Sequence, residues 1–328
     1  MKSFDFIAVG DIVADAFIRL SVAEEHLNKH APELCMPFAT KIPYESVAEI
    51  LAVGNCANAA VAAARLGLSS ALVSNQGDDE IAKKQREVLV SEKVGDEFVI
   101  DHSGMKSNYH YVLWFKDDRT ILVKHEDYPY TLPDIGEPKW LYITSLGPKS
   151  LDFHKILESY IVNHNSIQLA FQPGTFQIKM SKELMGLYKL AKIFFCNIEE
   201  AQLILNTKIE DPKLLMQKLH ELGPEIVCLT DGPNGAYALD GKTGEAWTIS
   251  TYPDPKPPFD RTGAGDAFAS TFTCAIALGK SIPEALAWAP INSMNVVQYV
   301  GAREGLLTRE KLEEYLANAP SAYKAAKL

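Results

Sequence analysis

The sequence predicts an α/β fold with a mostly parallel central sheet, helices on both faces, and a small β-strand lid. Short apolar runs alternate with helical patterns through most of the 328 residues, and this alternation is typical of parallel βαβ units. Two further segments, rich in β-branched and aromatic residues, do not fit this alternation. Because no linker or repeat divides the chain, we expect a single domain over residues 1–328.

The strands and helices of the main body follow from the apolar pattern, taken along the chain. The first strand, 4–10, is a buried run that ends in glycine. The helix at 55–66 is rich in alanine and is closed by Gly67 as a C-cap. Further strands are expected at 70–75, near 97–100, and at 139–144, 167–171, 192–195 and 225–230, and further helices at 78–90, 150–162, 182–190, 198–205 and 211–222.

The lid is expected from inserted β segments around 16–44 and 107–125. Residues 16–20 with 34–44, and 108–124, have the pattern of strands in a separate antiparallel layer. Asp117-Asp118 is expected to form a hairpin turn within the second segment. The aromatic side chains of the lid either line it, bury a homodimer contact or pack within the small sheet; they are Phe38, Tyr44, Tyr109, Tyr111, Trp114 and Phe115.

Composition and charge narrow the class of partner. The net charge is 32 − 42 = −10, and nucleic-acid binding needs a concentrated basic face instead. The five cysteines are scattered without a CxxC pair, which favours reduced thiols in a cytoplasmic protein. The acidic residues within the N-terminal apolar run exclude a signal peptide or a membrane span there. We therefore expect a small-molecule partner, and neither a nucleic acid nor a membrane.

Residues 260–268 (DRTGAGDAF) place small residues before a carboxylate that opens a run of good helix formers. Gly263, Ala264 and Gly265 allow a tight turn that brings N–H groups close to a ligand. The first turn of a helix adds unpaired donors and the positive end of its dipole, a combination that suits a phosphoryl group. Asp266 is a candidate base for an attacking hydroxyl. The alternative is an ordinary glycine turn with an acidic residue at the helix start.

Five segments together resemble a known family. Residues 260–268 match its C-terminal signature and 53–60 (VGNCANAA) its N-terminal signature. Residues 197–200 are similar to its Asn-x-x-Glu motif, 230–235 to its nucleotide loop, and 9–15 (VGDIVAD) to its opening strand. Because these matches occur in the expected order, the chain resembles the PfkB (ribokinase-like) family of carbohydrate and nucleoside kinases. The resemblance implies a ribokinase-like three-layer sandwich and an ATP-dependent kinase that transfers the γ-phosphoryl group to a hydroxyl of a sugar or sugar-like molecule.

The resemblance also implies roles for individual residues. Asp266 becomes the general base, and Gly263, Ala264 and Gly265 supply the anion hole. ATP and Mg²⁺ are the expected cofactors, and K⁺ is a further candidate. The implied contacts are Asp15, Gly54, Asn58 and Asp266 for the substrate; Asn197, Thr230, Gly232 and Gly235 for the nucleotide; Asn197 and Glu200 for Mg²⁺ through water; and Asp260 and Thr262 for a monovalent cation.

Several of these residues also have structural interpretations. Asp15 can be a turn acceptor, and Asn58 can bond its own helix backbone. Asn197 and Glu200 have the spacing of a capping box, and residues 230–235 can form a plain hairpin turn.

Some positions depart from the family pattern and leave the acceptor open. Val53 stands where a glycine is usual, Gln172 and Pro173 where an aspartate is frequent, and Arg261 where a small residue is usual. Arg119 is interpreted as a solvated side chain, with contact to a substrate oxygen as the alternative. The competing functions are a nucleoside (adenosine-like) kinase, in which lid aromatics stack on a base, and a catalytically silent ligand-binding scaffold of the same fold.

Overall fold

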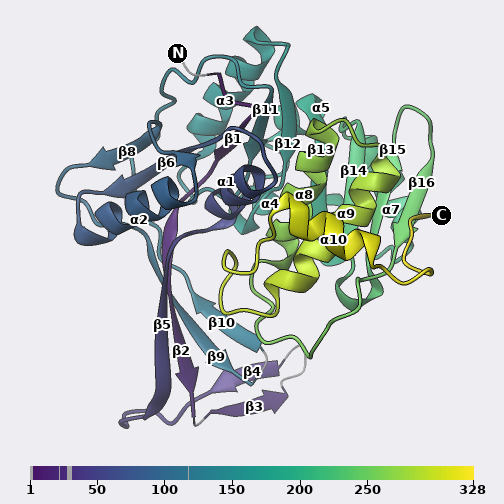
Figure 1. Ribbon diagram of the computed structural model, residues 1–328. Coiled ribbons are helices and arrows are strands. Elements are labelled where there is room, and N and C mark those ends of the chain that lie inside the picture. Colours follow the sequence, from purple (N-terminus) through teal and green to yellow (C-terminus); the bar gives the residue numbers. More distant parts are fainter. Residues whose placement is uncertain (1–2, 22, 28–31, 117) are drawn as a thin grey trace.

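A large sheet between two layers of helices forms the main body of the protein (Figure 1). The computed structural model describes residues 3–21, 23–27, 32–116 and 118–328. The strand order is β17-β16-β15-β14-β13-β12-β11-β1-β6-β7, and β8 pairs with β6. The bounds are β1 Phe6–Val9, β6 Ser70–Gly77, β7 Val94–Gly95, β8 Val99–His102, β11 Trp140–Ile143, β12 Gln168–Phe171, β13 Ala191–Asn197, β14 Ile226–Thr230, β15 Ala236–Asp240, β16 Ala246–Ile249 and β17 Ala326–Lys327.

The central strands are parallel, which confirms the predicted α/β class. Neighbours from β6 to β14 pair in parallel, and their apolar runs are buried on both faces, as expected for a covered parallel sheet. All seven strands expected from apolar runs are present. The strands β15 to β17 extend the sheet in antiparallel fashion, and the apolar pattern did not predict them.

Helices cover both faces of this sheet. On one face, α1 Asn55–Arg65, α2 Glu80–Ser91, α8 Ala264–Ala277, α9 Ile282–Val296 and α10 Arg309–Ala317 pack against alternate strand residues. On the other, α3 Leu151–Asn163, α5 Met185–Leu190, α6 Ile198–Leu205 and α7 Pro212–His220 pack against the intervening ones. The short helix α4 Thr175–Lys179 follows β12. No helix in the described part of the chain has both the length and the apolarity that crossing a bilayer requires.

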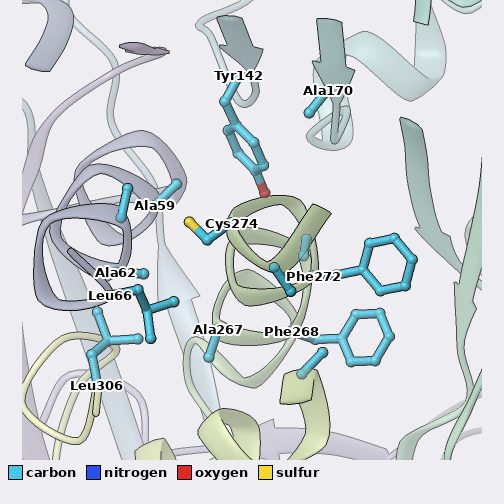
Figure 2. Packing of buried hydrophobic residues seen from close by; sticks show 14 of the residues in the cluster. Ala59, Ala62, Leu66, Tyr142, Ala170, Ala267, Phe268, Phe272, Cys274 and Leu306 are labelled. Atoms are coloured by element: carbon cyan, nitrogen blue, oxygen red, sulfur yellow. The ribbon is translucent and has the colours of Figure 1, made fainter. Parts of the chain in front are cut away.

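Small side chains bring α1 close to α8. Ala59 and Ala62 of α1 are fully buried in the same core as Phe268 and Phe272 of α8 (Figure 2). Alanine keeps a helix surface flat, so the two helix axes can approach closely. This contact holds the N-termini of α1 and α8 side by side, and both N-termini carry residues of the candidate site.

The predicted lid segments contribute to a separate four-stranded sheet with the order β10-β9-β2-β5. Its strands are β2 Val13–Leu20, β5 Tyr44–Val53, β9 Tyr109–Phe115 and β10 Asp118–Leu122. In Figure 1 this sheet extends below the main body, on the side of β1 and α2. The strands β9 and β10 pair in antiparallel fashion, as the expected hairpin requires, although Asp117 of its turn lies outside the described residues. The expectation of a wholly antiparallel layer was wrong, because β2 pairs with β9 in parallel.

The prediction of a strand at 34–44 was wrong. Among the described strands, β4, Pro32–Cys35, pairs with β3, Glu24–Leu27, and with no other, and β5 begins at Tyr44. The segment between β4 and β5 contains Pro37 and Pro43, which lack the N–H that a ladder needs. Strand β5 carries two glutamates, Glu45 and Glu49, which have low strand propensity, so only its pairing with β2 reveals it.

Candidate active site

The loop before α8 requires a glycine at position 263. Gly263 is the N-cap of α8 and has φ 81°, in the left-handed region. A Cβ atom built at Gly263 would lie 2.2 Å from Cβ of Ala302. The absence of a side chain therefore lets the 301–303 segment pack directly against the start of α8.

The buried carboxylate of Asp260 stabilises the same loop through hydrogen bonds. Its Oδ1 accepts hydrogen bonds from N (3.0 Å) and Oγ1 (2.7 Å) of Thr262, and its Oδ2 accepts one from Gly301 N (2.8 Å). Asp260 is buried, so these bonds join the loop to the 301–303 segment. The implied monovalent-cation site at Asp260 and Thr262 stays a prediction.

Three primary amides converge on the carboxylate of Asp266. Asn55 Nδ2 and Gln172 Nε2 donate to Oδ1 at 2.8 and 3.2 Å, and Asn58 Nδ2 donates to Oδ2 at 2.9 Å. Asn55 and Asn58 come from the first turns of α1, whereas Gln172 directly follows β12. The sequence analysis did not identify Asn55, and it treated Gln172 as a departure that blurred the substrate class. The structure places both residues against the candidate base.

The environment of Asp266 suits a proton acceptor. Desolvation raises the pKa of its carboxyl group; bonds from Asn58, Gln172 and Asn55 act in the opposite direction, and the charge of Asp15 raises the pKa further. A carboxylate whose pKa is raised toward neutral pH is a stronger base than a solvated one. The site therefore combines a fixed orientation with increased basicity.

A cavity of about 330 Å³ opens above Asp266. Gly263, Ala264 and Gly265 form part of its wall, so the N-terminus of α8 faces it. Arg119 of β10 and Arg261 also line the cavity. The side chain of Arg119 is only 27% exposed, so the structure places it in the cavity wall and not in open solvent. The four-stranded sheet thus contributes a cation to the wall of the cavity that the loop before α8 also lines.

Asn197 and Glu200 line the same cavity and also form the capping box of α6. Asn197 Oδ1 accepts from Glu200 N at 2.7 Å, and Glu200 Oε2 accepts from Asn197 N at 2.9 Å. Burial raises the pKa of the Glu200 carboxyl group, and the nearby charges of Glu199 and Asp266 add to this. A carboxylate near a second carboxylate in a polar cavity is stabilised by a cation, so the residues present fit Mg²⁺ held partly by water and phosphate oxygens.

A second cavity, of about 410 Å³, adjoins the first. Thr230, Gly232 and Gly235 line it after the end of β14, as the implied nucleotide loop requires. Thr230, Ala264 and Gly265 belong to both cavities. A ligand that occupies both cavities would therefore pass directly over the N-terminus of α8.

The remaining implied substrate residues, Asp15, Gly54 and Asn58, line neither of these two cavities. Asp15 lies on β2 with its Oδ1 3.4 Å from Nδ1 of His110. Asp15 Oδ1, Asn58 Oδ1 and His110 Nε2 are buried and have no hydrogen-bond partner among the residues that the structure describes. Gly54 has φ 96°, and its added Cβ would lie 2.6 Å from Asp11 O, so chain packing already requires glycine there.

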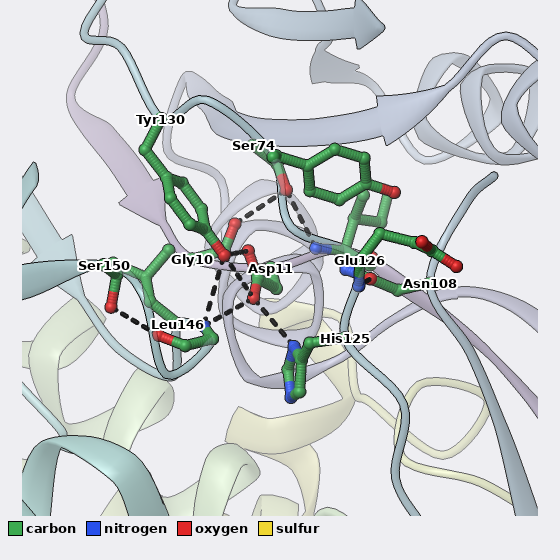
Figure 3. A network of polar contacts seen from close by, with 12 residues as sticks. Gly10, Asp11, Ser74, Asn108, His125, Glu126, Tyr130, Leu146 and Ser150 are labelled. Carbon is green, nitrogen blue, oxygen red and sulfur yellow. Dashed lines mark hydrogen bonds and ion pairs between the residues drawn. The ribbon is translucent and has the colours of Figure 1, made fainter. Parts of the chain in front are cut away.

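A polar network around Asp11 holds the segment that follows the four-stranded sheet (Figure 3). Asp11 accepts from Gly147 N at 2.8 Å and Tyr130 Oη at 3.0 Å, and its Oδ2 lies 2.9 Å from Nδ1 of His125. The imidazole rings of His125 and His110 lie edge to face at 5.5 Å. The sequence analysis missed both histidines, since no spacing pattern marks them; for Asp11, the available signal was its place directly after β1.

A fold of this kind does not by itself imply an activity, and comparison with known proteins gives the family of the chain. Residues 42–309 match the pfkB family carbohydrate kinases. The ribokinase of Haemophilus influenzae is 25% identical, over 87% of this chain and 95% of its own. The 5-dehydro-2-deoxygluconokinase of Geobacillus thermodenitrificans is 24% identical, over 98% and 95%. The solved structure of Arabidopsis thaliana ribokinase complexed with ribose and ATP covers 96% of this chain and 99% of its own, with a TM-score of 0.78 at 20% identity.

The chain belongs to the pfkB carbohydrate kinase family, whose members transfer phosphoryl groups to hydroxyl groups.

Proposed function

We propose that this protein is an ATP-dependent kinase that transfers the γ-phosphoryl group to a hydroxyl of a sugar or sugar-like molecule, with Asp266 as the general base. The observation that carries the proposal is the carboxylate of Asp266, held by three amides at the N-terminus of a helix that faces two joined cavities. The related ribokinase of A. thaliana binds ribose and ATP, and the same pair of ligands suits these cavities.

Each part of the site has a defined task in this reaction. Asp266 accepts the hydroxyl proton as the bond to phosphorus forms. The N–H groups of Gly263, Ala264 and Gly265, together with the α8 dipole, stabilise charge on the transferring group. Thr230, Gly232 and Gly235 contact the nucleotide, while Asn197 and Glu200 hold Mg²⁺ through water; the ion neutralises phosphate charge when bound.

The acceptor is best matched by a neutral polyhydroxyl compound. The unpaired buried atoms beside Asp266 are acceptors at Asp15 and Asn58 and a ring nitrogen at His110. Buried polar atoms of this kind need partners, and sugar hydroxyls supply them. The ribose of a nucleoside carries hydroxyl groups too, so nucleosides are compared directly with sugars as acceptors.

A coupled ADP-release assay over neutral sugars, sugar acids and nucleosides with ATP and Mg²⁺ tests the proposal. Turnover with a neutral sugar, dependent on Asp266, is the expected result. Preference for adenosine would favour the nucleoside kinase. ATP binding without turnover on any acceptor would favour the silent scaffold.

Changing Glu200 to glutamine is expected to raise the Mg²⁺ concentration needed for half-maximal rate by about tenfold or more. The amide retains the shape of the capping side chain but loses the negative charge that attracts the ion. Titration of the rate with Mg²⁺ at saturating ATP measures the change. Glu199→Gln is the matched control, because Glu199 is the exposed neighbour and lines neither cavity. Equal effects of the two substitutions would contradict a specific role for Glu200.

We also propose a homodimer formed through the four-stranded sheet. Apolar side chains on and near this sheet are exposed, among them Phe38 (97%), Tyr44 (59%) and Leu122 (52%). Exposed apolar groups gathered on one small sheet are typical of interaction surfaces. Sedimentation velocity is expected to show a dimer that Phe38→Ser combined with Leu122→Ser converts to a monomer. A monomeric wild-type protein would contradict this.

A further inference from the structure

A buried tyrosine and a glutamine form a hydrogen-bonded chain that ends on the candidate base. Tyr142 Oη donates to Gln172 Oε1 at 2.5 Å, and Gln172 Nε2 donates to Asp266 Oδ1 at 3.2 Å. Tyr142 is fully buried on β11, and Figure 2 shows its hydroxyl directed toward α8. Gln172 follows β12, the neighbouring strand. These two hydrogen bonds therefore connect the sheet to Asp266 on α8.

The chemistry of the two side chains determines which group donates and which accepts in each of these hydrogen bonds. Burial and the charge of Asp266 raise the pKa of the Tyr142 hydroxyl well above its ordinary value, so it stays a donor. A primary amide has one accepting and one donating end. Because the accepting end of Gln172 meets the tyrosine, its donating end must face Asp266. The reversed amide would set a carbonyl oxygen against the carboxylate.

We propose that Tyr142 and Gln172 are positioning residues that orient the Asp266 carboxylate and favour its ionised form. This inference rests on the proposed role of Asp266 as the base. Neither residue needs to touch the substrate. Tyr142 acts by holding the Gln172 amide in the donating orientation, and Gln172 acts by bonding Oδ1 of Asp266.

The surroundings of Asp266 make such donors necessary. The acidic side chains nearby, Asp15 on β2 and Glu200 on α6, oppose its ionisation. The thiol of Cys56 on α1 is neutral, because burial and the charge of Asp11 raise its pKa. Arg119 on β10 and Arg261 lie in the wall of the cavity, and no hydrogen bond joins either to Asp266 among the described contacts.

The test is a direct titration of the Asp266 carboxyl carbon by ¹³C NMR in the protein without substrate, with the signal assigned from Asp266→Asn. Gln172→Met keeps the length of the side chain but removes the donor. Losing a donor to the charged form makes ionisation harder, so the pKa of Asp266 is expected to rise by about one unit. Tyr142→Phe is expected to shift the pKa in the same direction, because the amide loses the bond that orients it.

The same shift has a kinetic consequence with a defined sign. When the pKa of the base rises, the acidic limb of the kcat/KM profile moves to higher pH. The deficit of Gln172→Met is therefore expected to be largest at low pH and to shrink as pH rises. A purely structural role would lower kcat/KM by the same factor at every pH.

Tyr188→Phe is the matched control. Tyr188 is also fully buried, but it belongs to the opposite core, and its hydroxyl has no hydrogen-bond partner in the described part of the chain. This change is expected to leave the Asp266 titration unaltered. Tyr142→Phe, which removes a single hydroxyl group and no charge, provides the measurement if the methionine variant does not fold.

An unchanged Asp266 titration in both the Gln172 and the Tyr142 variants would overturn the inference. The NMR titration requires no acceptor. If the protein had no kinase activity, the proposed function would be contradicted. The titration would still show whether Tyr142 and Gln172 control the ionisation of the Asp266 carboxylate.

Discussion

Asp266→Asn is expected to lower the rate of phosphoryl transfer by at least about 10²–10⁴-fold while ATP binding survives. The asparagine amide cannot accept the hydroxyl proton. Its NH₂ group would also face the donating NH₂ groups of Asn55, Asn58 or Gln172, so at least one of these hydrogen bonds is lost. The nucleotide loop of the second cavity is unchanged by the substitution. Turnover is measured with the coupled assay, and ATP affinity by isothermal titration calorimetry.

The control for this experiment is Asp152→Asn, the same chemical change on the exposed surface of α3. It is expected to leave both turnover and ATP affinity unchanged. Near-normal turnover in Asp266→Asn would contradict the assignment of the base. Loss of ATP binding in that variant would instead place Asp266 in the nucleotide site.

Gly263→Ala is expected to reduce kcat by about 10²–10³-fold, the usual effect of losing preorganised donors to a developing charge. Two costs combine at this position. The left-handed backbone at φ 81° disfavours any side chain, and the new Cβ would overlap Ala302. The loop must move away from the 301–303 segment, so its N–H groups no longer point into the cavity. The backbone strain also lowers the free energy of unfolding by about 1–3 kcal/mol.

Gly244→Ala separates strain from catalysis. Gly244 has φ 73°, but nothing lies within 4 Å of an added Cβ there, and it lines neither cavity. We expect a lower melting temperature and unchanged kcat. If Gly263→Ala lost stability to the same extent as Gly244→Ala and kept its kcat, the anion hole would not depend on this loop.

Much of the fold could be predicted from the sequence because its signals are local. The apolar runs that became β1, β11 and β12 are buried on both faces, and such strands leave a continuous apolar pattern. The start of α8 was also predictable, since glycines before a carboxylate mark a helix N-terminus. Strand β5 left no such pattern, because its pairing with β2 provides its stability.

The candidate site divides in the same way. Local sequence patterns predicted the helix start at 263–266 and the capping box of Asn197 and Glu200, because each depends on residues close together in the chain. The side chains that hold Asp266 can be identified only from the folded structure. Asn55 and Gln172 lie 211 and 94 positions away from it, and their contacts arise from the packing of α1 and β12 against α8. No local pattern encodes a contact of that kind, since it depends on how whole elements pack together.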